Sequence, residues 1–397
     1  MSRPRLLFVS PRFLFPLDQG GRIRTAGILR AMKGGAFEVT LASPVPADVE
    51  RFAGEIDGVC DRFVAWPEPR RAAFARVMML AGRLPVAVAW DRSATASRVV
   101  AEALGQTDLL VADFPHAAVL LERVPARSVI FTHNVEAEIF ERHAKVARWP
   151  MRRVWASQAR KMRRFEGETL RRFATAIAVS RRDSEVIARN YSHPRVRPIA
   201  TGVDLDFHAY TEPAASVPTG GGVVVFSGAM DWPANIDGLR FLMEAVWPIV
   251  RARRPSVRGV GVGRNPSAAL REQGARLGWS FTGYVDDVRP HVRAADVSVI
   301  PLRVGSGTRL KAFEAMAAGR PMVATTLGVE GLDVTHGEHL LVADDAPAFA
   351  EAILRLLDDD ALRLGMARAA RGLVEAKFGW DVVGRAFEAI CLEALET

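Results

Sequence analysis

The sequence contains little cysteine and no long apolar run. Its 397 residues include two cysteines, Cys60 and Cys391, and so distant a pair makes neither a disulfide framework nor a zinc-binding pattern. The N-terminal apolar run extends only from Leu6 to Val9, which predicts a strand rather than a signal peptide. The most apolar long stretch, 72–90, is interrupted by arginine and proline, so no membrane span is predicted. We therefore expect a protein of the reducing cytoplasm.

Lysine is scarce as well, because arginine supplies 48 of the 53 basic residues. Positive charge is unevenly divided: residues 1–206 hold 33 basic and 22 acidic residues, whereas 207–397 hold 20 and 23. The stretch 145–172 contains ten basic residues, two acidic ones and interleaved tryptophans. Such a surface can lie on an anionic membrane or hold an acidic acceptor, and a solvated helix face is the alternative. No nucleic-acid-binding module accompanies it, so nucleic acid is not an expected partner.

The length of the chain predicts two domains. A chain of 397 residues is too long for one ordinary core and fits two domains of about 200 residues each. Short apolar strands alternate with helical segments in both halves, which is typical of α/β domains with parallel sheets. Residues 210–222 are rich in Thr, Pro, Ala, Ser and Gly, which indicates a linker. We place an N-terminal domain at 1–208 and a C-terminal domain at 209–380.

A glycine loop follows the first predicted strand, Arg5 to Ser10. It contains Asp18, Gly20, Gly21 and Arg22, after which helical spacing resumes. The loop lacks the GxGxxG pattern of a dinucleotide site and could be a simple tight turn. Because ligands of open parallel sheets bind at the carboxyl ends of strands, we predict that these four residues form an acceptor or phosphate loop.

Three more polar residues follow predicted strands of the first half, namely Asp113, His116 and His133. Their positions at strand ends make all three candidates for ligand contact. His133 is the strongest, because an imidazole there can donate to a sugar hydroxyl or to a developing charge. The alternative is a helix cap formed by Asn134 or Thr132, with the histidine merely nearby.

The stretch Pro301 to Pro321 reads as a strand end, a glycine-rich loop and a helix. Gly305 and Gly307 let the backbone approach a ligand, while Arg309 and Lys311 add cations where the free N–H groups of a helix already favour an anion. These features predict a phosphate cradle. A βα turn with an incidental salt bridge is the alternative.

Glu314 lies on the first turns of the same predicted helix. A carboxylate there can accept hydrogen bonds from the vicinal hydroxyls of a ribose or hexose. The stretch as a whole therefore predicts a site for a sugar phosphate.

The chain resembles a GT-B glycosyltransferase of the large retaining family that includes sucrose synthase and many bacterial polysaccharide and lipid glycosyltransferases. The resemblance is carried in the second half by Phe281 to Pro321 and Gly328 to Leu332. In the first half it is carried by Pro16 to Arg24 and by Thr201 to Asp204, which matches a domain-junction motif. It implies two Rossmann-like, doubly wound domains that face each other across a cleft.

By position, Glu314 matches the family's second motif glutamate, which implies contact with the nucleotide ribose. Ser306 stands where the first glutamate is expected, and residues 227–235 lack the family's diphosphate-binding lysine. We predict that Arg309 and Lys311 replace that lysine. The predicted catalytic residues are His133, Arg309, Lys311 and Glu314. The predicted donor-binding residues are Gly228, Met230, Tyr284, Val285, Gly305, Ser306, Gly307, Thr308, Arg309, Lys311 and Glu314.

The resemblance also implies a reaction. A hexose passes with retention from a nucleotide diphosphate sugar, used as co-substrate, to a lipid-linked or polysaccharide acceptor, as in exopolysaccharide synthesis. No metal and no further cofactor are expected, and the enzyme is expected in the cytoplasm, at the inner face of the membrane. A UDP-sugar 2-epimerase and a non-catalytic nucleotide-sugar-binding subunit are the alternatives.

The last predicted helix, 378–395, carries an apolar stripe that needs a partner. Its members are Trp380, Val383, Phe387, Ile390 and Ala394. Helices of the second domain should already cover both faces of that sheet. We therefore predict that residues 381–397 return to the N-terminal domain and complete it, as GT-B enzymes also imply.

Overall fold

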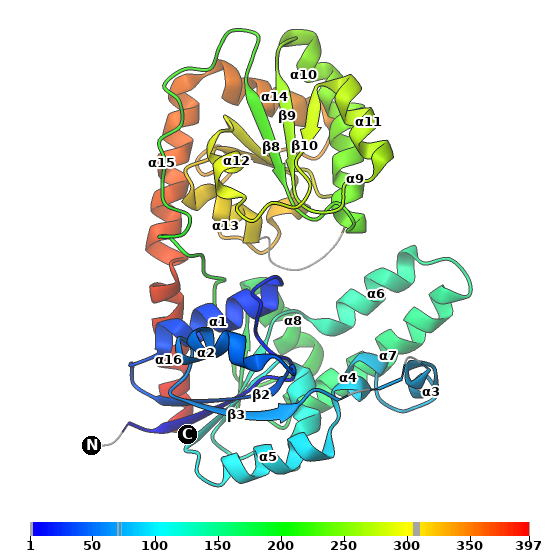
Figure 1. The fold of residues 1–397 in the computed structure, drawn as a ribbon, viewed down its shortest axis with the longest axis vertical. Coiled ribbons are helices and arrows are strands. Elements are labelled where there is room, and N and C mark those ends of the chain that lie inside the picture. Colours follow the sequence, from blue (N-terminus) through cyan, green and yellow to red (C-terminus); the bar gives the residue numbers. More distant parts are fainter. Residues whose placement is uncertain (1–2, 70, 73, 305–309, 397) are drawn as a thin grey trace. The chain divides into compact units, whose positions relative to one another are not determined.

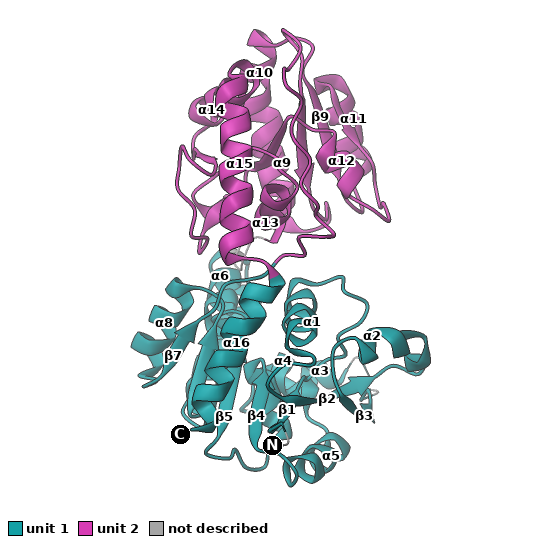
Figure 2. Cartoon of the chain, turned by 90° about the vertical axis from the view of Figure 1, so that its left-hand side faces the viewer, with its two compact units in different colours: residues 1–202, 380–397 teal, residues 203–379 magenta. Residues whose placement is uncertain are grey.

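A computed structural model describes residues 3–69, 71–72, 74–304 and 310–396. The chain divides into two compact units (Figure 2). Unit 1 comprises Met1–Gly202 and Trp380–Thr397, and unit 2 comprises Val203–Gly379. The first crossing between them falls inside the Thr201–Asp204 motif.

Unit 1 is built on a seven-stranded parallel sheet with the strand order β3-β2-β1-β4-β5-β6-β7 (Figure 1). Alternate residues of β1 point to opposite faces: Leu6 and Phe8 join one apolar cluster, Leu7 and Val9 the other. The sheet is therefore covered by helices on both faces, as a doubly wound fold requires. In chain order the elements are β1 (Arg5–Val9), α1 (Gly20–Met32), β2 (Glu38–Val45), η1 (Val49–Phe52), α2 (Ala53–Asp57), β3 (Arg62–Pro67), α3 (Ala75–Met79), α4 (Val86–Asp91), α5 (Ala94–Leu104), β4 (Leu109–Asp113), η2 (Pro115–Leu120), β5 (Ser128–Thr132), α6 (Glu136–Val146), α7 (Met151–Leu170), β6 (Thr175–Ala178), α8 (Arg181–Tyr191), β7 (Val196–Pro198) and α16 (Trp380–Leu395).

Helix α16 packs on unit 1, as predicted. Val383, Phe387 and Ile390 are buried in the same apolar cluster as β1 and α1, and the Phe387 ring contacts Phe131 of β5 edge-on, with centroids 5.2 Å apart. The predicted return of the C-terminal helix to the N-terminal domain is confirmed.

Unit 2 is built on a six-stranded parallel sheet with the order β10-β9-β8-β11-β12-β13. Val224 and Phe226 of the central strand face one cluster and Val225 the other, so this sheet is doubly wound too. The prediction of two parallel-sheet α/β domains is confirmed. The elements of unit 2 are β8 (Val223–Ser227), α9 (Pro233–Phe241), η3 (Leu242–Val246), α10 (Trp247–Arg253), β9 (Arg258–Val262), α11 (Ala268–Leu277), β10 (Trp279–Phe281), α12 (Arg289–Arg293), β11 (Val297–Ile300), α13 (Leu310–Ala317), β12 (Met322–Ala324), η4 (Leu327–Val329), β13 (Leu341–Val342), α14 (Ala346–Asp358) and α15 (Asp360–Lys377).

The segment 210–222 does not link the units but lies within unit 2, so the linker prediction is wrong. Arginine side chains hold it there by its backbone carbonyls. Arg254, which is 4% exposed, donates to the carbonyls of Pro218 and Gly221, and Arg363 donates to that of Ala214. Composition alone could not reveal these distant partners.

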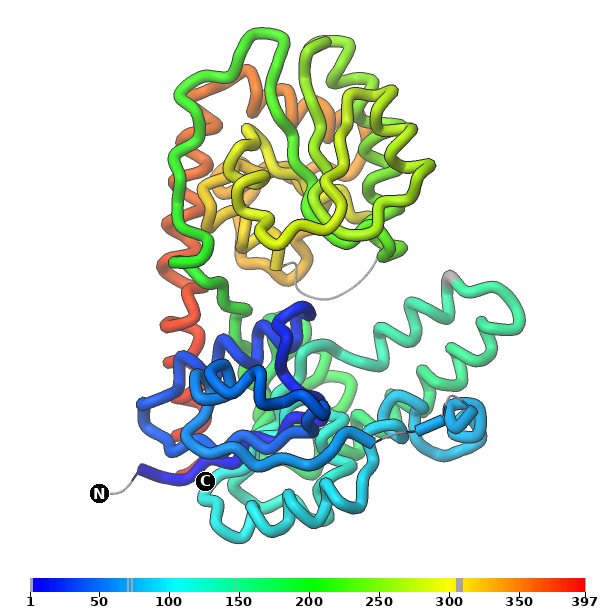
Figure 3. Tube along the Cα trace, in the orientation of Figure 1, coloured from blue at the N-terminus to red at the C-terminus, as the bar shows by residue number. Residues whose placement is uncertain are grey.

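The basic stretch 145–172 covers the end of α6, the turn of a hairpin and all of α7. Figure 3 shows α6 and α7 side by side, extending from the sheet of unit 1, with α7 beginning directly after Pro150. The described part of the chain contains no helix long and apolar enough to cross a membrane.

Candidate functional site

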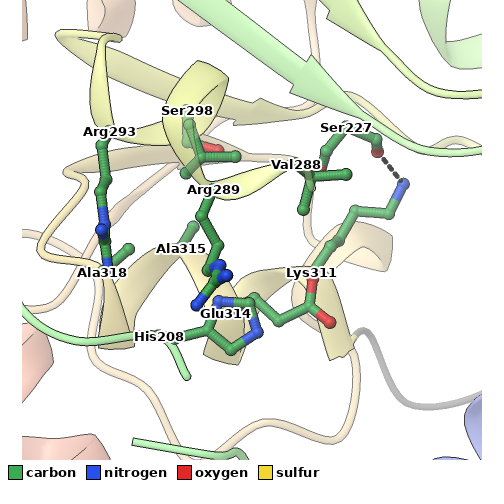
Figure 4. Close-up of a pocket in the computed structure, with 11 residues that line it drawn as sticks. His208, Ser227, Val288, Arg289, Arg293, Ser298, Lys311, Glu314, Ala315 and Ala318 are labelled. Carbon is green, nitrogen blue, oxygen red and sulfur yellow. Dashed lines mark hydrogen bonds between the residues drawn. The ribbon is translucent and has the colours of Figure 1, made fainter. Parts of the chain in front are cut away.

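The carboxyl end of β8 and the helix after β11 meet at the point in unit 2 where the strand order reverses. Ligands of open α/β sheets bind at such a switch point. Lys311 and Glu314 of α13 line a pocket there with Ser227, the last residue of β8 (Figure 4). The pocket is further lined by His208, Val288, Arg289, Val292, Arg293, Ser298, Ala315 and Ala318.

The ammonium group of Lys311 lies against the loop that follows β8. Its Nζ donates to the carbonyl of Ser227 at 2.8 Å and to Oδ1 of Asn235 at 3.2 Å, and it lies 4.7 Å from the centre of the Phe226 ring. A Cβ at Gly228 would come within 2.9 Å of this ammonium. A cation from α13 is thus placed beside a loop that has no cation of its own.

Glu314 is half-buried in the same pocket. Burial raises the pKa of its carboxyl group, and Lys311 partly opposes that rise. Its carboxylate accepts no hydrogen bond from the residues that the structure describes. The group is therefore available to hydroxyl donors of a ligand.

Two arginines and a histidine also line the pocket. The Arg289 guanidinium stacks 3.8 Å from the centre of the Phe207 ring, and Arg293 donates to the carbonyl of Ala209. Burial, with the two arginines, lowers the pKa of His208 to about 4. At neutral pH this histidine is uncharged, so the cations here are the two arginines, of which Arg289 pairs with Asp287 at 2.8 Å.

The other predicted donor-binding residues lie in different surroundings. The prediction for Met230 is wrong, because its side chain is 2% exposed in the apolar core and its N–H donates to the carbonyl of Arg264. Tyr284 is 76% exposed and Val285 half-buried, and neither lines the pocket. Gly305, Ser306, Gly307, Thr308 and Arg309 lie outside the described residues.

In unit 1 the predicted Asp113 and His133 are both buried and bonded to each other. Oδ1 of Asp113 lies 2.6 Å from Nε2 of His133, and Nδ1 of His133 lies 3.0 Å from Nη1 of Arg24. Arg24 also donates to Thr201, and burial lowers its pKa to about 10. These contacts assign the imidazole proton to Nε2, facing the carboxylate. We call Arg24, Asp113 and His133 the buried triad.

The buried triad corrects two predictions. His133 has no nitrogen left to donate to a sugar, since both are occupied within the triad. Asp113 is 0% exposed and also accepts from Ser10 and Thr25, so its carboxylate cannot reach a ligand either. Neither side chain is therefore available for direct contact with a ligand.

The helix-cap alternative for His133 is wrong as well. Helix α6 begins after Val135, which provides no side-chain cap, and Thr132 donates to the carbonyl of Ile177. The cap comes instead from α7, where Glu166 accepts from the N–H groups of Glu136 and Ala137. In the sequence, the only sign that Glu166 has this capping role is that it is an acidic residue within the basic stretch 145–172.

The first glycine loop is shorter than predicted, because Gly20 and Gly21 form the first turn of α1. Asp18 and Arg22 pair with each other at 2.9 Å near the surface. His116 is buried, with Nδ1 2.8 Å from Asp91, and its Nε2 has no partner among the described residues. The structure thus gives His116 a structural partner rather than a place on an open loop.

Two residues at these sites carried no recognisable signal in the sequence. Arg24 is one of 48 arginines, and only the fold brings it to His133. Asn235 holds Lys311 from the helix after β8, at the place where the family resemblance leads one to look for a cation.

Comparison with known proteins agrees with this architecture. Residues 221–359, which include the pocket residues of β8, α12 and α13, match the family described as glycosyl transferases group 1. A phosphatidyl-myo-inositol mannosyltransferase of Mycolicibacterium smegmatis is 35% identical over 191 residues, which make up 47% of this chain and 48% of that protein. The chain thus spans about half the length of the curated relatives it matches.

Solved structures resemble the chain over nearly its whole length. Sucrose-phosphate synthase from Thermosynechococcus elongatus superposes with a TM-score of 0.70 at 19% identity and 99% coverage of both chains. The Anabaena protein Alr3699/HepE, in complex with UDP and glucose, does so with a TM-score of 0.68 at 14% identity, covering 98% of this chain and 100% of that one. The chain has the GT-B fold of these solved structures, and its residues 221–359 are similar to the group 1 glycosyltransferase family.

Proposed function

We propose that the chain transfers a hexose from a nucleoside diphosphate sugar to a lipid-linked or polysaccharide acceptor. The observation that carries the proposal is the pocket of unit 2, where Lys311 and Glu314 lie at the switch point beside the carboxyl end of β8. The relative from Mycolicibacterium smegmatis is named for mannosyl transfer to a phosphatidyl-myo-inositol, and the Anabaena structure contains UDP and glucose. These names support the same class of donor and acceptor.

In the proposed reaction Lys311 faces the diphosphate and Glu314 accepts from the hydroxyls of the ribose. The bond between the anomeric carbon and the diphosphate oxygen breaks, and its electron pair passes to that oxygen. The positioned ammonium stabilises the charge that develops there. The acceptor hydroxyl attacks on the same face, and its proton passes to the leaving phosphate. The anomeric configuration is thereby retained.

The donor site is tested by isothermal titration with the UDP-, GDP- or ADP-sugar that binds best. Lys311→Met should weaken binding of that sugar by about 10- to 150-fold, the equivalent of one charge-assisted hydrogen bond. Binding of the bare nucleoside should not change. The double variant Lys311→Asn with Asn235→Lys returns the cation from the other side of the same contact and should recover part of the loss. Equal losses for sugar nucleotide and nucleoside would show that Lys311 is structural.

Turnover decides between a transferase and the alternatives. A transferase releases the nucleoside diphosphate only when an acceptor is added, an epimerase converts the sugar without one, and a binding subunit does neither. NMR of the product anomer tests retention, and an assay in EDTA tests whether a divalent metal is required.

We propose further that unit 1 binds an anionic membrane through α3 and the turn of the α6–α7 hairpin. Phe74, Val77 and Met78 are 72%, 66% and 71% exposed, and Trp149 is 75% exposed. Lys161 of α7 donates to the carbonyl of Leu80 just after α3 at 2.7 Å, which ties the two elements together. Apolar side chains of this kind insert into the headgroup region.

Exposed arginines accompany these apolar side chains. Arg76 lies 4.6 Å above the Trp90 ring, and Arg152 and Arg153 are exposed at the start of α7. Positive charge near an anionic bilayer contributes about 1 kcal/mol per residue. Such a surface would bring the enzyme to a lipid-linked acceptor.

Vesicle sedimentation tests the membrane proposal. The full chain should bind phosphatidylcholine vesicles that contain phosphatidylglycerol and not those of phosphatidylcholine alone. Phe74→Ser combined with Met78→Ser should reduce binding at least tenfold, because two large apolar side chains are lost. Leu392→Ser is the control, since Leu392 of α16 is also exposed, at 40%. Equal binding by the double variant and the control would refute the role of α3.

A further inference from the structure

The backbone of Phe114, directly after β4, adopts a conformation that is rare for a residue with a side chain. Its φ is 65° and its ψ 150°, a combination found almost only in glycine. Ser192 also has a positive φ, but its φ of 52° and ψ of 38° lie in the left-handed helical region, which is less costly for a small polar residue than for a bulky one. Phe114 is thus held in a strained conformation by its surroundings.

The strain turns two consecutive side chains toward the same imidazole. In a regular strand Asp113 and Phe114 would point to opposite faces of the sheet. Here Asp113 bonds the edge of the His133 ring, while the Phe114 ring stacks on its face, with centroids 3.8 Å apart and planes at 16°. Phe131 lies 4.4 Å from the same imidazole. The unusual backbone is what allows His133 to be held by both residues.

The tip of the Phe114 ring also reaches the first turn of α1. A Cβ at Gly21 would lie 2.8 Å from Cζ of Phe114, which is closer than side chains can approach. The ring therefore explains why glycine stands at position 21. It connects the buried triad with the turn that carries Arg22.

This contact lies at the switch point of unit 1. Strands β1 and β4 are neighbours although they are far apart in the sequence, and the strand order reverses between them. By the rule for open α/β sheets, a ligand of this unit binds at the carboxyl ends of these two strands. Phe114 follows β4 directly, and its ring is half-buried.

We propose that Phe114 is a positioning residue for the transfer reaction: its ring keeps water from His133 and fixes the first turn of α1 at the acceptor side. The role in transfer rests on the proposed function, whereas the shielding of His133 does not. The charged groups that face the imidazole are Asp113 at Nε2 and Arg24 at Nδ1. Burial lowers the pKa of His133, which agrees with a neutral ring that water does not reach.

A matched pair of variants separates the ring from the strained backbone. Phe114→Ala removes the ring and keeps the strain, whereas Phe114→Gly removes both. The glycine variant should therefore melt about 2 °C or more above the alanine variant. In both, NMR should show His133 titrating near its ordinary pKa of about 6.5, with His133→Gln used to assign the signal. In wild type the same signal should move only at lower pH.

Turnover is the readout that a purely structural role would not change. In both variants kcat should fall at least tenfold with donor affinity unchanged, because small displacements of reacting groups are costly. Phe114→Tyr should be worse than Phe114→Leu, since a hydroxyl on Cζ would add an atom where the ring tip already lies 2.8 Å from the Cβ position of Gly21.

Two results would overturn the proposal: identical titration of His133 in wild type and Phe114→Gly, or an unchanged kcat in that variant. If wild type transfers no sugar, the proposed function fails, and the melting and NMR measurements still decide whether the ring shields His133.

Discussion

The polar side chains near the two switch points of this chain differ in whether other residues of the fold bond to them. In unit 1, Asp113 and His133 bond to each other inside the core, and His133 also bonds to Arg24. In unit 2, Glu314 stays half-buried with a carboxylate that no described residue donates to. Position at a strand end therefore does not make a residue a ligand contact. What decides is whether the fold supplies an internal partner for the same atoms.

The largest effect on stability is expected from a substitution that breaks the buried triad. Asp113→Asn removes the negative charge that offsets the nearby buried Arg24 guanidinium, so the free energy of unfolding should fall by about 3–5 kcal/mol. Urea unfolding of the full chain measures the loss.

The matched control is Asp18→Asn, which breaks the exposed pair with Arg22. That change should cost less than about 1 kcal/mol, as surface ion pairs do. Similar losses in the two variants would remove the distinction between a buried network and a surface pair.

A second buried carboxylate of unit 1, that of Glu166, makes the stability of the chain depend on pH. Glu166 accepts two backbone N–H groups and the Tyr191 hydroxyl, and burial raises its pKa from 4.5 to about 7. The folded state then holds a proton that the unfolded state has released between these pH values. Stability should fall as pH rises through this window, by about 3 kcal/mol in all.

Glu166→Gln removes this titration. The variant has its own constant loss, since an amide nitrogen cannot accept from the backbone, so the test is the slope. Plotted against pH from 4.5 to 7, the stability of wild type relative to the variant should decrease. A constant difference would mean that Glu166 is ionised in the folded state throughout.

The smallest expected effect concerns the open carboxylate of unit 2. Glu314→Gln should weaken donor binding by about tenfold, because a hydrogen bond to a charged group becomes one to a neutral group. The raised pKa of Glu314 adds a pH signature. Wild-type affinity should decline on acidification, whereas the affinity of the variant should not follow that decline. If both decline together, another group is titrating.

Much of the fold is legible in the sequence, because local patterns specify it. Apolar runs mark the strands, and Ser180, a residue type that favours the N-cap position, caps α8 by accepting from the N–H of Asp183. The apolar stripe of α16 indicated its return to unit 1, since Val383 and Phe387 needed an apolar partner.

The site was less legible, because it depends on contacts between distant segments. Arg24 reaches His133 across 109 positions and Lys311 reaches Asn235 across 76. Met230 has the same loop context as Gly228, yet its side chain fills the core. Spacing along the chain carries no information about such pairings, so the sequence located both switch points without distinguishing an occupied side chain from an available one.

The indole of Trp380 has a consequence for engineering the chain. A Cβ at Gly202 would lie 2.1 Å from this ring, so the last residue before unit 2 and the first after it touch each other. On the other side of the junction, the N–H of Val203 donates to the carbonyl of Phe378 at 2.8 Å. Residues 203–379, which form unit 2, are therefore an insertion into unit 1 whose two ends lie next to each other. Removing residues 203–379 and joining Gly202 directly to Trp380 should leave a unit 1 with a complete sheet, and another domain with equally close ends could be inserted in their place.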